Sequence, residues 1–227
     1  MKKTFYTEWA YSAGLVILAL GTALMERANF GMSMVVAPAY LVHLKVSQVL
    51  PFFSFGMAEY MLQAVLLVAL ALLMRRWKRA YLFSFVTAVI YGFALDGSIA
   101  LMALVPGSGT AFRVVCYLLG MVLCSAGVAM LFRTYISPEA YELFVKELAQ
   151  KHHLSISRVK TVYDCVSCAV GVALSFAFFG FGTFEGVKAG TIVCALVNGY
   201  LIGRLDALYG RCFEFRDGLA LRKFFEV

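Results

Sequence analysis

The chain has 227 residues, of which 62% are hydrophobic, and its mean hydropathy is +0.83. A soluble domain has only about half apolar residues, and here the excess is gathered into long runs, as in integral membrane proteins. The net charge of +7 comes from Lys and Arg residues in the short segments between these runs. That pattern belongs to membrane topology, so we expect the lipid bilayer as a partner and no nucleic acid.

Six apolar runs are long enough, or nearly so, to cross about 30 Å of hydrocarbon at about 1.5 Å per residue. A backbone in lipid must satisfy its own hydrogen bonds, so these runs are predicted to be helices. They are Trp9–Met25, Phe52–Met74, Leu82–Val105, Ala111–Phe132, Tyr163–Phe181 and Gly190–Leu208. The expected fold class is an all-α integral membrane protein with six transmembrane helices.

The distribution of positive charge predicts the orientation. With an even number of spans, both termini lie on one side of the membrane. Most of the 20 Lys and Arg residues fall at the termini and in the second and fourth connections, whereas only Arg27, Lys45, Arg113 and Lys188 fall in the others. The positive-inside rule therefore predicts cytoplasmic N- and C-termini, in a bacterial plasma (inner) membrane.

The two halves of the chain resemble each other. Gly127–Arg133 echoes Gly21–Arg27, and each half reads as helix, broken connection, helix, helix. Because each half has three spans, the second half must be inverted relative to the first. We predict a 3+3 inverted repeat with broken or re-entrant connections. The first repeat covers residues 1–107, and the second covers residues 108–227 with a cytoplasmic C-terminal tail.

The two broken connections are predicted in more detail. The apolar segment Met34–His43 is too short to span, which indicates a re-entrant or interfacial segment. Its counterpart, Pro138–His153, is predicted to be an amphipathic helix at the membrane surface. Ser137 is the expected N-cap of that helix, and Pro138 its first helical residue.

Three stretches carry a resemblance to a known family: Arg27–Ser33, Ser137–Glu139 and Gly190–Gly199. The chain resembles the bacterial YczE/YitT-type membrane proteins, which carry an R/K-A-N-x-G-x-S-P element and a G-T-x-x-x-A-L-x-x-G element. It departs from that pattern at Met34, where the first element usually has proline. The resemblance implies a multi-span membrane protein and no settled activity.

Four of the polar residues inside the predicted spans are candidate site residues. Glu59 and Gln63 are four residues apart and share a helical face, while Asp96 and Asn198 lie at similar depth in other spans. Ionisable residues at membrane depth are costly and usually face a cavity or a partner. We expect a polar cavity in which Glu59 or Asp96 exchanges a proton or binds a cation. The alternative is that these residues only form hydrogen bonds between helices.

A second group of candidates lies at the two broken connections. We call them the first break, from Arg27 to His43, and the second break, from Arg133 to His153. Arg27 and Arg133 are repeat partners, and Asn29 and Ser33 follow Arg27 closely. We expect Arg27, Asn29 and the amide groups near Ser33 to attract an anionic group, since a helix N-terminus supplies free N–H donors. The alternative for both arginines is snorkelling to the membrane interface.

Small residues recur every four positions in two spans. They are Ala88 and Gly92 in the third span, and Ala195, Gly199 and Gly203 in the sixth. Because this spacing lets helices approach closely, we expect these two spans to pack together centrally.

The favoured function is transport of a small polar or anionic solute by alternating access, with proton coupling. One alternative is a substrate-binding membrane subunit of a larger transporter, and another is a non-transporting regulator or assembly factor. No motif for catalysis, a cofactor or a metal is found, so we expect none of the three. The sequence leaves open a homo-oligomer or an energising partner subunit.

Overall fold

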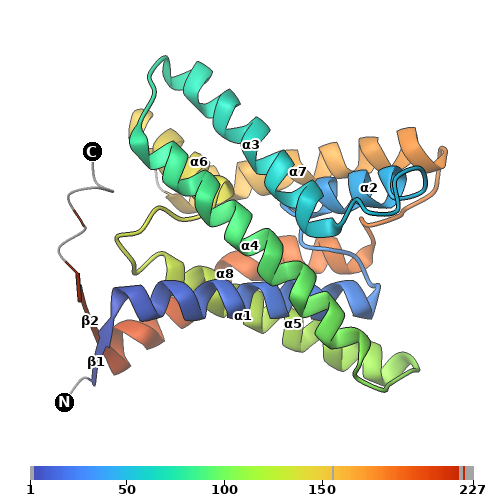
Figure 1. The fold of residues 1–227 in the computed structure, drawn as a ribbon, viewed down its shortest axis with the longest axis horizontal. Helices are drawn as coiled ribbons and strands as arrows, with labels where there is room; N and C mark the ends of the chain where they lie inside the picture. The colour runs from blue at the N-terminus through green and yellow to red at the C-terminus, as the bar shows by residue number, and fades with distance from the viewer. Residues whose placement is uncertain (1–2, 155, 220–221, 223–227) are drawn as a thin grey trace.

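A computed structural model of the chain describes residues 3–154, 156–219 and 222, which form eight helices and one pair of short strands (Figure 1). Six of the helices are long and apolar enough to cross a membrane, which confirms the predicted fold class and all six spans. The elements are β1 (Lys3–Tyr6), α1 (Thr7–Ala28), α2 (Ala37–Val46), α3 (Phe55–Met74), α4 (Arg79–Ala103), α5 (Thr110–Leu131), α6 (Ala140–Lys151), α7 (Ile156–Phe179), α8 (Ala189–Cys212) and β2 (Phe213–Arg216).

The two ends of the chain lie on the same side of the molecule. Strand β1 pairs in parallel with β2, with Lys3 opposite Phe213 and Tyr6 opposite Arg216. Figure 1 accordingly shows β1 and β2 at its left edge. We call this side the terminus side.

Helices α1 and α5 form the centre of the protein. About half of each span is buried, 50% for α1 and 56% for α5, against 17% to 33% for the other four. A Cβ atom on Gly21 would lie 2.8 Å from the Gly120 carbonyl oxygen, and one on Gly127 would lie 2.7 Å from that of Gly14. Only glycine permits this approach of two backbones. Gly14 meets Gly127 and Gly21 meets Gly120, so residue numbers rise along α1 as they fall along α5. The two helices are therefore antiparallel.

The expectation that α4 and α8 pack together centrally is wrong. Gly92 of α4 does meet a close neighbour, but that neighbour is the backbone of Gly56 in α3. Gly199 and Gly203 of α8 are exposed and have open space around them. Small residues at a four-residue spacing allow close packing, but they do not specify the partner.

The packing of the helices follows the two halves of the chain. Helix α1 packs on α4 as α5 packs on α8. Likewise, α2 packs on α3 and α7, while α6 packs on α7 and α3. Since exchanging α1–α4 with α5–α8 reproduces these pairs, the architecture has the internal symmetry expected of an inverted repeat. The exact division between the repeats, after residue 107, stays a prediction.

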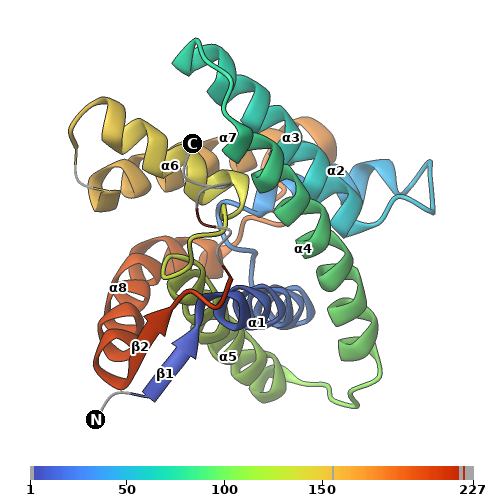
Figure 2. The ribbon, with the colours of Figure 1, turned by 60° about the vertical axis from the view of Figure 1, so that its left-hand side comes forward.

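The two short helices lie on opposite sides of the molecule (Figures 1 and 2). The predicted N-cap of the second one is wrong, because α6 starts at Ala140 and its N-cap residue is Glu139. Ser137 and Pro138 lie before the helix, where their carbonyl oxygens accept hydrogen bonds from Thr87 and Ser84 of α4 at 2.9 and 2.7 Å. These bonds hold the second break against α4. The first turn of α6 is buried rather than at the surface.

Candidate functional site

The two breaks meet at a small cavity in the middle of the protein. Ser33, Val35 and Val36 line it from the first break, and Glu139, Tyr141 and Glu142 line it from the second. Its volume is about 30 Å³, room for a water molecule or two. The remaining wall comes from the middle of the long helices, with Leu18, Thr22, Tyr91, Cys124, Val128, Asn198 and Ile202, and from Lys160 near the start of α7. We call this space the central cavity.

Acidic side chains surround the central cavity. Glu139 and Glu142 are 2% and 5% exposed, and each has one carboxyl oxygen without a hydrogen-bond partner among the described residues. Burial, and then the neighbouring carboxyls of Glu142 and Glu59, hold the pKa of Glu139 well above its usual range. Burial also raises the pKa of Glu142, although the ammonium group of Lys160 opposes that shift. A carboxyl in this setting keeps its proton more readily than one in water.

Gln63 links the acidic groups of the two halves. Its Nε2 donates to Glu139 Oε2 at 3.0 Å and lies 3.5 Å from Glu59 Oε1, while its Oε1 accepts from the backbone N–H of Ala140 at 2.9 Å. Glu59 and Gln63 are 0% exposed. Gln63 therefore supplies the missing cap of α6 and forms a continuous polar chain from α3 to the second break.

Asn198 belongs to the same site. Its Oδ1 accepts a hydrogen bond from the hydroxyl of Ser125 at 2.8 Å, and its side chain lines the central cavity. Across the cavity, the Tyr91 hydroxyl pairs with that of Thr22 at 2.9 Å. The predicted residues Ser33, Glu59, Gln63 and Asn198 thus gather in one region, as the prediction of a polar cavity requires.

A larger polar cavity of about 580 Å³ opens on the terminus side. We call it the polar vestibule. Ile136, Ser137 and Pro138 of the second break form one wall, and the tail residue Arg222 forms another. The next residue in the chain, Glu139, lines the central cavity. The second break is therefore the partition between the vestibule and the cavity.

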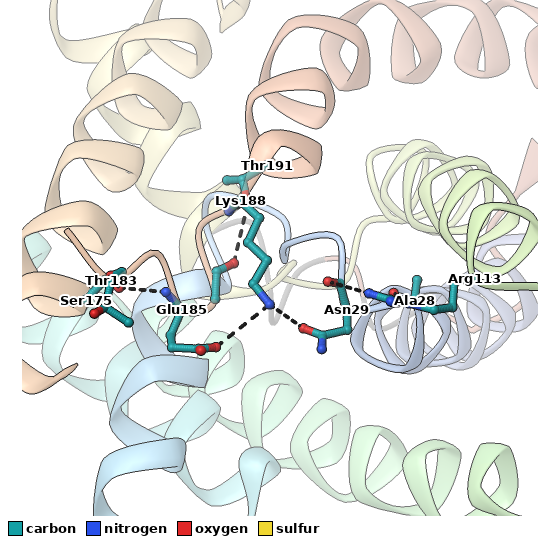
Figure 3. Close-up of polar contacts among 9 residues, drawn as sticks. Ala28, Asn29, Arg113, Ser175, Thr183, Glu185, Lys188 and Thr191 are labelled. Atoms are coloured by element: carbon teal, nitrogen blue, oxygen red, sulfur yellow. Dashed lines mark hydrogen bonds and ion pairs between the residues drawn. The ribbon is translucent and has the colours of Figure 1, made fainter. Parts of the chain in front are cut away.

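The opposite side is closed by a network around Asn29 (Figure 3). Asn29 ends α1 in the left-handed conformation, with a φ of 54°. Its side-chain oxygen accepts from Lys188 Nζ at 2.6 Å, and Arg113 donates to the carbonyl oxygens of Ala28 and Asn29 at 2.7 and 3.1 Å. Lys188 also lies 3.8 Å from Glu185. These bonds tie the end of α1 to the start of α5 and to the loop before α8.

Backbone contacts close the same side further. Gly190 N–H donates to the Phe30 carbonyl, and Met32 N–H donates to the Gly186 carbonyl, at 2.9 and 2.8 Å. Gly31 has a φ of 112°, and a Cβ atom there would lie 2.5 Å from Thr191 Oγ1. The first break is thus held by the second half of the chain, just as the second break is held by α4 of the first half.

The matched family can be stated once this geometry is known. The model of DUF6198, a family of unknown function, matches residues 5–207. The chain belongs to this family. The match includes both breaks and all of the central cavity. No curated protein and no solved structure matches the chain.

Four predicted site residues of this DUF6198 protein lie away from the central cavity. Arg27 donates to the Val105 carbonyl at 2.6 Å. Arg133 forms a two-point contact with the Asp206 carboxylate, at 2.6 and 3.0 Å. Asp96 accepts from the Ser54 hydroxyl and from the Gly56 N–H, at 2.6 and 2.8 Å, and so stabilises the start of α3. Asn29 is likewise occupied by Lys188. These groups form contacts within the protein, and the anion site at Arg27 and Asn29 stays a prediction.

The carboxyls of the second break were not predicted as site residues. Glu139 and Glu142 stand in a segment whose alternating charges are typical of a solvated surface helix, so no local pattern predicts that they are buried. Lys160 and Tyr91 were missed for a related reason, because each is an ordinary residue near a helix end or on an apolar face. The available signal was the repeat itself, which aligns Glu139 with Ser33 of the first break.

Proposed function

We propose that this DUF6198 protein is a secondary transporter of a small polar solute, coupled to protons and working by alternating access. The observation that carries the proposal is the meeting of the two breaks, one from each inverted half, at a buried cavity lined by the carboxyls of Glu139 and Glu142. In inverted-repeat transporters, the solute site lies between the repeats and is formed by broken helices.

The two sides of the site support the alternating-access part of the proposal. On the terminus side, the polar vestibule reaches the second break, so only Ser137 to Glu139 separate it from the central cavity. On the other side, the Asn29 network and the backbone bonds around Gly31 close the path. This arrangement corresponds to a state that faces the terminus side and is closed on the other.

The acidic groups support the proton-coupling part. A charged carboxylate in a small buried cavity is unfavourable, so Glu139 tends to hold its proton, although the ammonium group of Lys160 in the cavity wall opposes this. Losing that proton would place a negative charge beside Glu59 and Glu142, although the Gln63 amide, which donates a hydrogen bond to Glu139, favours the charged form. When deprotonated, the same carboxyls would disfavour an anionic solute in the cavity and favour a neutral or cationic one.

The resemblance to the YczE/YitT-type proteins and the distribution of Lys and Arg complete the proposal. They support a location in a bacterial inner membrane with the terminus side facing the cytoplasm. The vestibule would then open to the cytoplasm, and the Asn29 network would face outward.

The test uses purified protein in liposomes that contain pyranine, a pH-sensitive dye. Neutral and cationic polar solutes, such as amino acids, amines and sugars, are added outside in turn, and a solute that is cotransported with or exchanged for protons changes the internal pH. The change should disappear in Glu139→Gln and persist in Glu214→Gln, a matched change of an exposed carboxylate in β2.

Each outcome decides between the competing functions. Solute-driven proton movement in liposomes that hold this chain alone would exclude a binding subunit that needs an energising partner. Solute uptake with no proton movement, equal in wild type and Glu139→Gln, would refute the coupling. No uptake of any solute, combined with copurification of a partner protein, would favour a subunit or regulator instead.

A further inference from the structure

A third cavity, of about 560 Å³, lies between α3, α6 and α7 and is almost entirely apolar. Its volume falls in the range of sites that hold ligands of the size of a drug or an acyl chain. We call it the apolar groove. Its walls come from three helices, with Leu62 and Leu66 of α3, Phe144 and Leu148 of α6, and Val162 and Val166 of α7.

The groove opens to the surface that the spans present to lipid. Val162, Val166 and Val170 line it, and yet their side chains are 63%, 57% and 46% exposed. All three lie on α7, a candidate span of which only 17% is buried inside the protein. In a membrane, hydrocarbon rather than water would fill this opening.

One end of the groove is positively charged. Arg158 and His152 line it at the start of α7 and just after α6, on the terminus side. Arg158 is exposed, and no acidic side chain pairs with it among the described residues. A basic residue at the end of an apolar path between spanning helices is the arrangement that recognises an acidic lipid headgroup.

The other end of the groove reaches the central site. Val35 and Tyr141 line both the apolar groove and the central cavity. The Tyr141 side chain is 2% exposed, and its hydroxyl, which points toward Glu59, forms no hydrogen bond of ordinary geometry with a described residue. Whatever fills the groove therefore packs against the wall of the central cavity.

We propose that the apolar groove binds one acyl chain of an anionic phospholipid, whose headgroup phosphate contacts Arg158. Burial of the chain gives little selectivity, since neighbouring lipid is as apolar as the groove. The selectivity comes from the headgroup. One basic residue at the membrane surface corresponds to about a fivefold preference for an anionic over a zwitterionic lipid. The bound chain would support α6 from its lipid-facing side.

Quenching of tryptophan fluorescence by brominated lipid tests this proposal. Both native tryptophans, Trp9 and Trp77, are first replaced by phenylalanine. A single tryptophan is then introduced by Val162→Trp, in the groove, or by Val68→Trp, on a face of α3 that is exposed but outside the groove. The protein is placed in phosphatidylcholine vesicles that contain rising fractions of dibrominated phosphatidylglycerol.

The tryptophan at position 162 should reach half-quenching at a fraction of brominated lipid about fivefold lower than the one at position 68. Arg158→Gln should remove this difference, whereas Arg79→Gln, an exposed arginine at the start of α4, should leave it intact. Should Val162→Trp not fold, Val166→Trp provides the same measurement.

Two results would overturn the proposal. Equal quenching curves at positions 162 and 68, unchanged by Arg158→Gln, would mean that the groove holds bulk lipid without selection. Absence of quenching at position 162 at every fraction would mean that protein, such as a second copy of this chain, fills the groove. Neither readout depends on transport, so the lipid site is tested separately from the proposed function.

Discussion

Replacing Gln63 by leucine should loosen the second break more than any other single change near the cavity. The side chain is 0% exposed and forms bonds at both ends of its amide group, one to Glu139 and one to the N–H of Ala140. Leucine has a similar size and removes both bonds at once. It leaves the Ala140 N–H and both oxygens of Glu139 without partners.

The expected loss can be worked out from these two bonds. Each buried polar group left without a partner costs about 1–3 kcal/mol, so two such groups should lower the free energy of unfolding of Gln63→Leu by about 2–6 kcal/mol. At about 2–4 °C per kcal/mol for a chain of this size, the midpoint of thermal unfolding should fall by about 4–24 °C. The matched control is Gln150→Leu, at an exposed position later in α6, where a change within about 0.5 kcal/mol is expected.

The measurement is thermal unfolding of the detergent-solubilised protein, followed by tryptophan fluorescence. The break should also become accessible before the whole protein unfolds, because Gln63 holds the start of α6 directly. A cysteine introduced by Ser137→Cys, in a background in which the accessible Cys165, Cys168 and Cys212 are replaced by serine, would report this as faster labelling by a maleimide in Gln63→Leu than in Gln150→Leu. If Gln63→Leu unfolds and labels like the control, Gln63 does not hold the break and the coupling argument fails.

Three further predictions follow from the same contacts. Burial raises the pKa of Glu139 in the folded protein above its usual value of 4.5. The protonated Glu139 carboxyl therefore contributes its full stability below pH 4.5, and this contribution is lost as pH rises through the raised pKa. The midpoint of thermal unfolding of the wild type should fall between these two pH values, and it should fall less in Glu139→Gln. Gly31→Ala should lower the free energy of unfolding by about 1–3 kcal/mol, measured by thermal unfolding, because its φ is 112° and a Cβ would crowd Thr191. Asp96→Asn should weaken the start of α3 by about 1.5–3 kcal/mol and leave any proton coupling intact in the liposome assay, since this carboxylate bonds to the N–H of Gly56 and does not line the central cavity.

The sequence predicted the helices and part of the site for one physical reason. In lipid, the backbone must satisfy its own hydrogen bonds and most side chains must be apolar. The spans therefore appear in the sequence as long apolar runs, and any polar residue inside such a run is conspicuous. Glu59, Gln63 and Asn198 were found in this way. Asp96 was also conspicuous as an ionisable residue inside an apolar run, but in the structure it accepts a hydrogen bond from Gly56 N–H at the start of α3. A charged residue at membrane depth indicates that a partner exists, but it does not identify that partner.

Other candidate site residues have partners that lie far away in the chain. Arg27 and Asn29 stand together in the sequence, which suggested an anion site. In the structure, Arg27 bonds to the carbonyl of Val105 and Asn29 to Lys188. Only the packing of α1 against α5 and the loop before α8 brings these partners close, and no local pattern records that packing.

The two breaks occupy equivalent positions in the repeat but carry different side chains, and this difference affects how proton coupling could work. Ser33 of the first break aligns with Glu139 of the second, and both line the central cavity. The repeat aligns Gln63 of α3 with the apolar segment 170–173 of α7. The first break therefore has no carboxyl at this position and no amide bridge to it. Of the two aligned residues, only Glu139 can take up or release a proton, so protonation at Glu139 would control one side of the site, while the opposite side would open by breaking the Asn29 network.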